Sequence, residues 1–226
     1  MSAPNIILDE LPDAVEVSGK HYAINTDFRS SIDFAIVLHD NNIDPLERIV
    51  RGLDIYYTAE MPDDKGKAYA ACIGFYRCGE EIEEAEEEGE AQKRKAPEIK
   101  RPPRKRVLDY EQDARYIFAA FMGQYRMDLS EIDYLHWWKF KAMMDGLNDS
   151  QMIVKIMGYR GADLGKIKNK QEKDRIRRLQ LIFSIKEDYT PEQMAVIAGN
   201  AFAGGLNADY RPNVGNKKRI TPETGD

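Results

Sequence analysis

Apolar and polar residues alternate in two short runs near the start of the chain, within residues 14–24, with Ser18 and Gly19 between them. The apolar positions of the two runs are Val15, Val17, Tyr22 and Ile24. A period of two is typical of a half-buried strand, and a glycine-containing break of two residues is typical of a tight turn. The pattern therefore predicts a β-hairpin, which must pack on a helix because an isolated hairpin is only marginally stable.

A helix start follows the hairpin at Asp44. Asp44 can cap the helix, Pro45 suits the first helical position, and Glu47 is placed to reach back to the cap. Apolar residues then recur every three or four positions, at Leu46, Ile49, Val50, Leu53, Tyr56 and Tyr57. This spacing predicts one amphipathic helix with an apolar face. Shorter helices are predicted at 32–38 and 69–76.

Helical spacing returns strongly after residue 108, with an apolar face formed by Ala114, Ile117, Phe118, Phe121, Met122 and Tyr125. We expect a second helix capped by Ser130, with Asp133 at its third position and Gly146 as its end. A third helix is predicted at 171–185, with Ile176, Leu179 and Phe183 facing inward. A fourth is predicted to start at Thr190, with Pro191 and Gln193 completing its start signal and Gly204-Gly205 ending it.

Charge, rather than periodicity, dominates between residues 79 and 106. Eight glutamates and no basic residue occupy 80–90, and eight basic residues face a single glutamate in 93–106. Like charges repel, and Pro97, Pro102 and Pro103 oppose a helix, so we expect a solvated linker. The predicted organisation is a hairpin with helices in 1–78, this linker in 79–106, a helical bundle in 107–206 and a disordered tail in 207–226. The predicted fold class is mainly α, a helical bundle with a short N-terminal β-hairpin, and whether 1–78 is an independent domain stays open.

The sequence contains no motif for a reactive centre. A phosphate-binding glycine loop, a zinc-protease helix, a nucleophile elbow and a C-x-x-C pair are all missing from it. Cys72 and Cys78 have neither disulfide-framework nor zinc spacing, and we interpret them as small apolar residues in a reducing cytoplasm. His136 lies three residues after Asp133, a pair that needs further ligands to hold a metal. We therefore expect no enzyme activity, no metal and no cofactor.

The adjacent pair Trp137 and Trp138 is the strongest candidate for contact with a partner protein. Neighbouring helical positions point about 100° apart, so the two rings do not enter one core from the same face. Packing of both in the core is the favoured interpretation. Exposure of one ring to a partner is the alternative, because tryptophan is over-represented among binding hot spots.

Three segments resemble the bacteriophage gene-product-fifteen family, proteins of siphophages and of prophages in Gram-positive bacteria. They are residues 24–29 after the hairpin, residues 133–140 around the two tryptophans, and residues 156–160 followed by 166–168. The resemblance covers most of residues 11–185 without the charged segment. We select Tyr134, Trp137, Trp138, Tyr159 and Arg160, all within these segments, as candidate protein-binding residues.

The resemblance implies a gene in the tail module, and so a tail assembly chaperone that binds the tape-measure protein and helps recruit tail-tube subunits. It implies no catalytic residues. Self-association is open, and with neither a signal peptide nor an apolar run of membrane length we expect a protein of the host cytoplasm that is absent from the mature virion.

Two other functional classes stay open as alternatives. One is a structural component of the tail or of the head–tail connector. The other is a nucleic-acid-binding protein that uses the basic residues of 93–106 and the seven basic residues of 166–178, although the net charge of −6 disfavours it.

Overall fold

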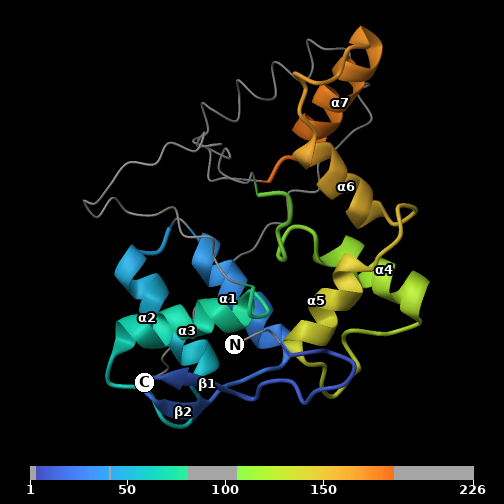
Figure 1. Cartoon of the computed structure of the whole chain (residues 1–226). Coiled ribbons are helices and arrows are strands. Elements are labelled where there is room, and N and C mark those ends of the chain that lie inside the picture. The colour runs from blue at the N-terminus through green and yellow to red at the C-terminus, as the bar shows by residue number, and fades with distance from the viewer. Residues whose placement is uncertain (1–3, 41, 81–105, 186–226) are drawn as a thin grey trace, which may run out of the picture. The chain divides into compact units, whose positions relative to one another are not determined.

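The computed structural model describes residues 4–40, 42–80 and 106–185, which belong to one compact unit (Figure 1). Two strands and seven helices form within these ranges. The strands are β1 (Ala14–Val17) and β2 (Lys20–Ala23), and the helices are α1 (Phe28–His39), α2 (Pro45–Tyr56), α3 (Lys65–Tyr76), α4 (Ala114–Tyr125), α5 (Trp137–Asp145), α6 (Met152–Gly161) and α7 (Lys170–Ile182). The predicted class, mainly helical with an N-terminal hairpin, is confirmed.

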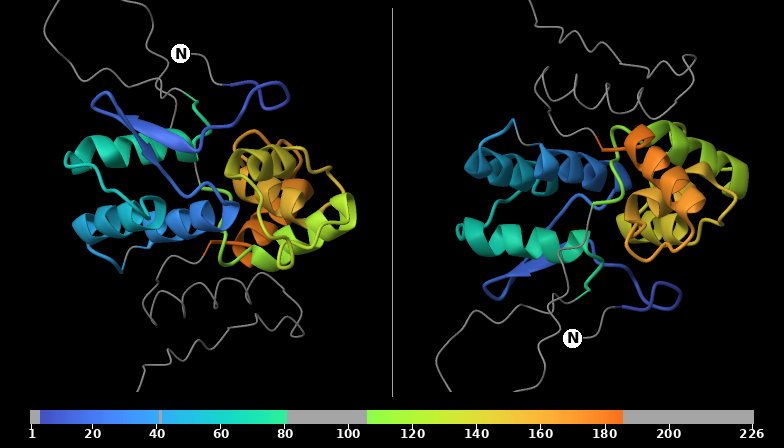
Figure 2. Two further views of the ribbon diagram at one scale, coloured as in Figure 1. Left: turned by 90° about the horizontal axis from the view of Figure 1, so that it is seen from below. Right: turned by 90° about the horizontal axis from the view of Figure 1, so that it is seen from above.

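The hairpin forms where the alternation predicts it. β1 pairs with β2 in antiparallel register, from Ala14 opposite Ala23 to Val17 opposite Lys20. Ser18 and Gly19 both have positive φ, 52° and 82°, as a two-residue turn between twisted strands requires. β1 packs on α3, which provides the helix that the hairpin needs (Figure 2).

Helices α1, α2 and α3 pack in sequence, α1 on α2 and α2 on α3. Each begins at an aspartate, Asp27, Asp44 or Asp64, whose side chain accepts a backbone N–H of the first turn. The cap at Asp44 was predicted, but Glu47 does not complete it as expected and instead pairs with Arg51 one turn later.

The second group of helices departs from the predicted boundaries. α4 begins at Ala114, not near residue 108. The predicted cap at Ser130 is wrong: Ser130 donates its backbone N–H and its hydroxyl to Asp128 in a turn, and α5 begins only at Trp137, after the cap residue His136. The predicted end at Gly146 is confirmed. Helix α6 was not predicted, because its buried residues Ile153 and Ile156 are too few to display a long period.

Stacked aromatic rings join the two groups of helices. Trp137 of α5 stacks on Tyr76 of α3, with ring centroids 5.2 Å apart. Phe140, one turn further along α5, stacks on Phe121 of α4 at 5.1 Å and on Phe28 of α1 at 4.9 Å. Residues on both sides of the segment 81–105 therefore share one core.

Several predicted features lie outside the described residues. They are nearly all of the charged segment, the helix predicted from Thr190 and the tail after residue 206. Within the described ranges, no helix is both long and apolar enough to span a membrane.

Candidate protein-binding surface

Two of the three sequence segments that carry the family resemblance bind each other. The backbone of Phe28 donates to Leu135 O at 2.9 Å, and that of Trp137 donates to Thr26 O at 2.8 Å. Arg29 donates to two carbonyls of the loop before α5, Leu129 O at 3.0 Å and Ile132 O at 2.7 Å. These segments therefore act as a clasp that fixes the start of α1 against the start of α5.

His136 belongs to this clasp and is not positioned as a metal ligand. Its Nδ1 accepts the backbone N–H of Trp138 at 3.1 Å, so its Nε2 carries the proton and donates to Pro12 O at 3.1 Å. Burial lowers the pKa of His136, which favours this neutral, capping form. Within the described ranges, no cluster of three or more histidine, cysteine or acidic side chains could hold a metal ion.

Both tryptophans of the candidate set are buried, as the favoured interpretation held. Trp137 is 1% exposed, and its indole N–H donates to Tyr76 O at 2.7 Å. The indole N–H of Trp138 donates to Phe75 O at 2.9 Å. Adjacent helical positions reach one core because both rings bind the carboxyl end of α3, whose last carbonyls lack helical partners. In this fold both rings hold the helices together, and little of their area faces solvent.

Arg160 is likewise a buried structural residue. Its guanidinium forms a two-pronged ion pair with Asp113, of which one bond, Nη2 to Oδ1, is 2.9 Å long. It also donates to Val107 O at 3.0 Å and to Phe183 O. Arg160 thus joins α6, the start of α4 and the end of α7, so its selection as a partner-binding residue is not supported by its position.

The two tyrosines of the set lie nearer the surface. Tyr134 is 57% exposed although its hydroxyl meets Thr26 Oγ1 at 2.7 Å. Tyr159 is half-buried and stacks on Phe183. Of the five selected residues, Tyr134 alone presents most of its area to solvent.

An exposed apolar surface with no charged residue within it lies on α4. Phe118 and Met122, spaced one turn apart, are 39% and 40% exposed, although their spacing predicted an inward face. The exposed residues Ala119 and Gly123 form a second row beside them, and no charge occurs from residue 116 to 125. We call Phe118, Ala119, Met122 and Gly123 the α4 face. The amide of Gln151 is 3.8 Å from the position of a Cβ on Gly123, so the start of α6 borders this face.

The exposed apolar residues of α2 have a different setting. Leu46 is 68% exposed and Val50 is also exposed, but the ion pair of Glu47 with Arg51 lies on the same turns. An apolar partner that covered this ion pair would remove its water without replacing the lost hydrogen bonds, which costs free energy. The α2 surface is therefore the ordinary solvated side of a helix.

The basic stretch that suggested nucleic-acid binding is only partly described. On α7, Arg175 pairs with Glu172 at 2.9 Å and Arg177 with Asp174 at 3.1 Å. These carboxylates compete with phosphate for the same guanidinium groups. Residues 93–105 lie outside the described ranges.

Comparison with known proteins gives one match. The sequence model of a family described as "Bacteriophage Gp15 protein" matches residues 7–185, a range that contains all nine described strands and helices. No curated protein and no solved structure matches the chain.

Proposed function

The chain belongs to the bacteriophage Gp15 protein family, and from this premise we propose that it is a tail assembly chaperone. In this role it binds the tape-measure protein of the same phage and helps to recruit tail-tube subunits. It acts in the host cytoplasm, leaves before the virion is complete, and does no chemistry of its own.

The observation that carries the proposal is the α4 face. Phe118 and Met122, four residues apart on the helix, form one exposed row, and Ala119 and Gly123, which lack long side chains, form a second row beside it. A row of small residues beside a row of larger ones forms a groove, into which a second helix can place its own side chains at close approach. The face carries no charge, so a partner helix that covers it leaves no ion without water.

A tape-measure protein of the kind that the resemblance implies suits this surface. Long helices with continuous apolar faces aggregate unless a partner covers them. The α4 face contains only two large apolar side chains, so each copy binds weakly and many copies along one helix provide the retention. Weak binding per copy also allows displacement when tube subunits assemble.

Co-expression of the chain with its phage's tape-measure protein tests the proposal. We expect the wild-type chain to keep the tape-measure protein in the supernatant and to co-elute with it on gel filtration. The double variant F118E/M122E should lower the affinity at least about tenfold. Each side chain loses about 1 kcal/mol of apolar burial, and each new carboxylate loses water on binding.

The matched control is L46E/V50E on α2. It places the same two charges at more exposed apolar positions, so binding should be unchanged. Equal binding by F118E/M122E and wild type would show that the α4 face is not the binding surface. A tape-measure protein that stays insoluble and forms no complex with the wild-type chain would contradict the chaperone function. Mass spectrometry of purified virions distinguishes a chaperone from a structural component of the tail. A stoichiometric copy number in the virion would contradict a chaperone that leaves before the virion is complete.

A further inference from the structure

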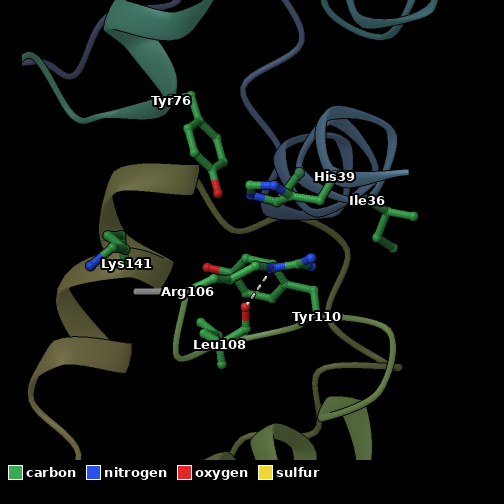
Figure 3. A pocket seen from close by; sticks show the side chains of 8 residues that line it. Ile36, His39, Tyr76, Arg106, Leu108, Tyr110 and Lys141 are labelled. Atoms are coloured by element: carbon green, nitrogen blue, oxygen red, sulfur yellow. Dashed lines mark hydrogen bonds between the residues drawn. The ribbon is translucent and has the colours of Figure 1, made fainter. Parts of the chain in front are cut away.

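A cavity of about 170 Å³ lies where the two groups of helices meet, away from the residues of the α4 face (Figure 3). Ala35, Ile36 and His39 of α1 line it, together with Tyr76 at the end of α3, Arg106, Leu108 and Tyr110 before α4, and Lys141 of α5. The site of a drug-sized ligand usually exceeds about 300 Å³, so this cavity suits one side chain or one small molecule.

Each polar side chain that lines the cavity can donate a hydrogen bond. Figure 3 shows the Tyr76 hydroxyl directed toward the layer formed by Arg106 and Tyr110, with Lys141 and His39 on opposite sides. Neither phenol hydroxyl has a hydrogen-bond partner among the described residues. Burial raises the pKa of Tyr76 to about 12, so its hydroxyl keeps its proton at neutral pH.

The charged residues of the lining are cationic. Arg106 donates from Nε to Leu108 O at 3.2 Å and from Nη2 to Asp109 Oδ2 at 2.8 Å, which fixes the guanidinium plane. Lys141 is held by Asp145 at 2.6 Å. Asp109 and Asp145 pair with these cations, and neither carboxylate is among the residues that line the cavity.

We propose that this cavity binds a carboxylate carried on a short apolar stem, the chemistry of a glutamate side chain or of a small aliphatic acid. Arg106 and the two phenol hydroxyls bind the carboxylate oxygens, and Lys141 adds charge. Ala35, Ile36 and Leu108 contact the methylene groups of the stem. Hydrogen bonds to a charged oxygen are about twice as strong as neutral ones, which gives the site its preference for an acid over an amide.

The pKa of His39, which lines the cavity, should report whether a carboxylate is bound there. Loss of solvent and the nearby cations Arg106 and Arg48 lower its pKa, against an opposing contribution from Asp109. A bound carboxylate adds a negative charge and so must raise this pKa. With three histidines in the chain, the ring protons of His39 are readily assigned by NMR through a His39→Gln variant.

The experiment titrates the full-length chain with N-acetyl-glutamate amide, with butyrate, and with N-acetyl-glutamine amide as the uncharged isostere. We expect at least one acid to bind and to raise the His39 titration midpoint, and the glutamine compound to bind at least about tenfold more weakly. Tighter binding of the blocked glutamate assigns the ligand to a polypeptide, and tighter binding of butyrate to a free acid; both support the proposal.

Variants test the assignment of the donors. R106Q should abolish the His39 shift. Y76F should weaken binding about five- to tenfold without lowering the melting temperature, because the lost hydroxyl has no partner in the unliganded protein. The matched control R177Q removes a guanidinium from the exposed side of α7 and should leave binding unchanged. Binding of neither acid at millimolar concentration, equal binding of acid and amide, or unchanged binding by R106Q would each overturn the proposal.

Discussion

The buried ion pair between Arg160 and Asp113 provides the sharpest test of how this fold is held together. Replacement of Arg160 by methionine keeps most of the side-chain volume but removes every donor. Asp113, whose side chain is 1% exposed, then retains a charge with only the backbone N–H of Asp109, at 3.0 Å, among its observed partners. The carbonyls of Val107 and Phe183 lose their partner as well.

The expected loss of folding free energy in R160M comes from the groups that lose the partner Arg160. Removal of one partner of a buried ion pair costs about 3–5 kcal/mol, because the remaining charge lacks both water and its counter-ion. A chain of this size loses about 2 kcal/mol of stability per molar urea, so the unfolding midpoint should fall by about 1.5–2.5 M. The double variant R160M/D113N should recover about 1–2 kcal/mol of this loss, since asparagine can still accept from Asp109 and carries no charge.

Urea unfolding followed by tryptophan fluorescence measures these changes, because Trp137 and Trp138 are both in the core. The control is R177M, which removes an exposed partner of Asp174 and should change stability by less than about 0.5 kcal/mol. A loss below 1 kcal/mol in R160M would refute the claim that this pair joins α4, α6 and α7.

Two further predictions concern the core. G52A should lower the free energy of unfolding by about 1–3 kcal/mol in the same assay, because a Cβ there would lie 2.8 Å from a ring carbon of Phe34 and 3.2 Å from one of Tyr69. G74A is also within a helix but has open space at its Cβ, so it should instead stabilise the fold by about 0.5–1 kcal/mol. Equal effects of the two alanines would contradict the packing described for α2. Burial raises the pKa of Cys72 to about 12 and that of Cys78 to about 11, so at pH 8 the native thiols should react with Ellman's reagent at least about a hundredfold more slowly than in urea. Fast reaction in the folded protein would contradict the burial of Cys72 or the partial burial of Cys78.

Local sequence chemistry was a good guide to this protein wherever a structure is decided by neighbouring residues. The hairpin follows from alternation and from Ser18-Gly19, and the start of α2 from Asp44-Pro45. Gly146 ends α5 as its position suggests. In each case the hydrogen bonds or the φ preference that decide the feature lie within a few residues of it, so no distant contact is needed to recognise it.

The candidate surface could not be derived in the same way. Apolar spacing shows that Ile117, Phe118, Phe121 and Met122 share a broad side of a helix, but it does not show how much of that side the neighbours cover. Packing against α5 and α6 buries Ile117 and Phe121 and leaves Phe118 and Met122 partly open. The same holds for α2, where the apolar positions of the first turns remain in water.

By itself, the sequence determined the helical class, the hairpin, several helix ends and the family resemblance, because these rest on local periodicity and on short motifs. Only the tertiary structure decided that Ser130 is not a cap. Backbone hydrogen bonds join Leu135 and Trp137 to Phe28 and Thr26 in the clasp, and α5 begins only at Trp137. It also decided that Trp137, Trp138 and Arg160 are internal, because their partners, Tyr76, Phe75 and Asp113, are 47 to 63 residues away in the chain. Burial is a property of such distant contacts, and a pattern of neighbouring residues does not contain them.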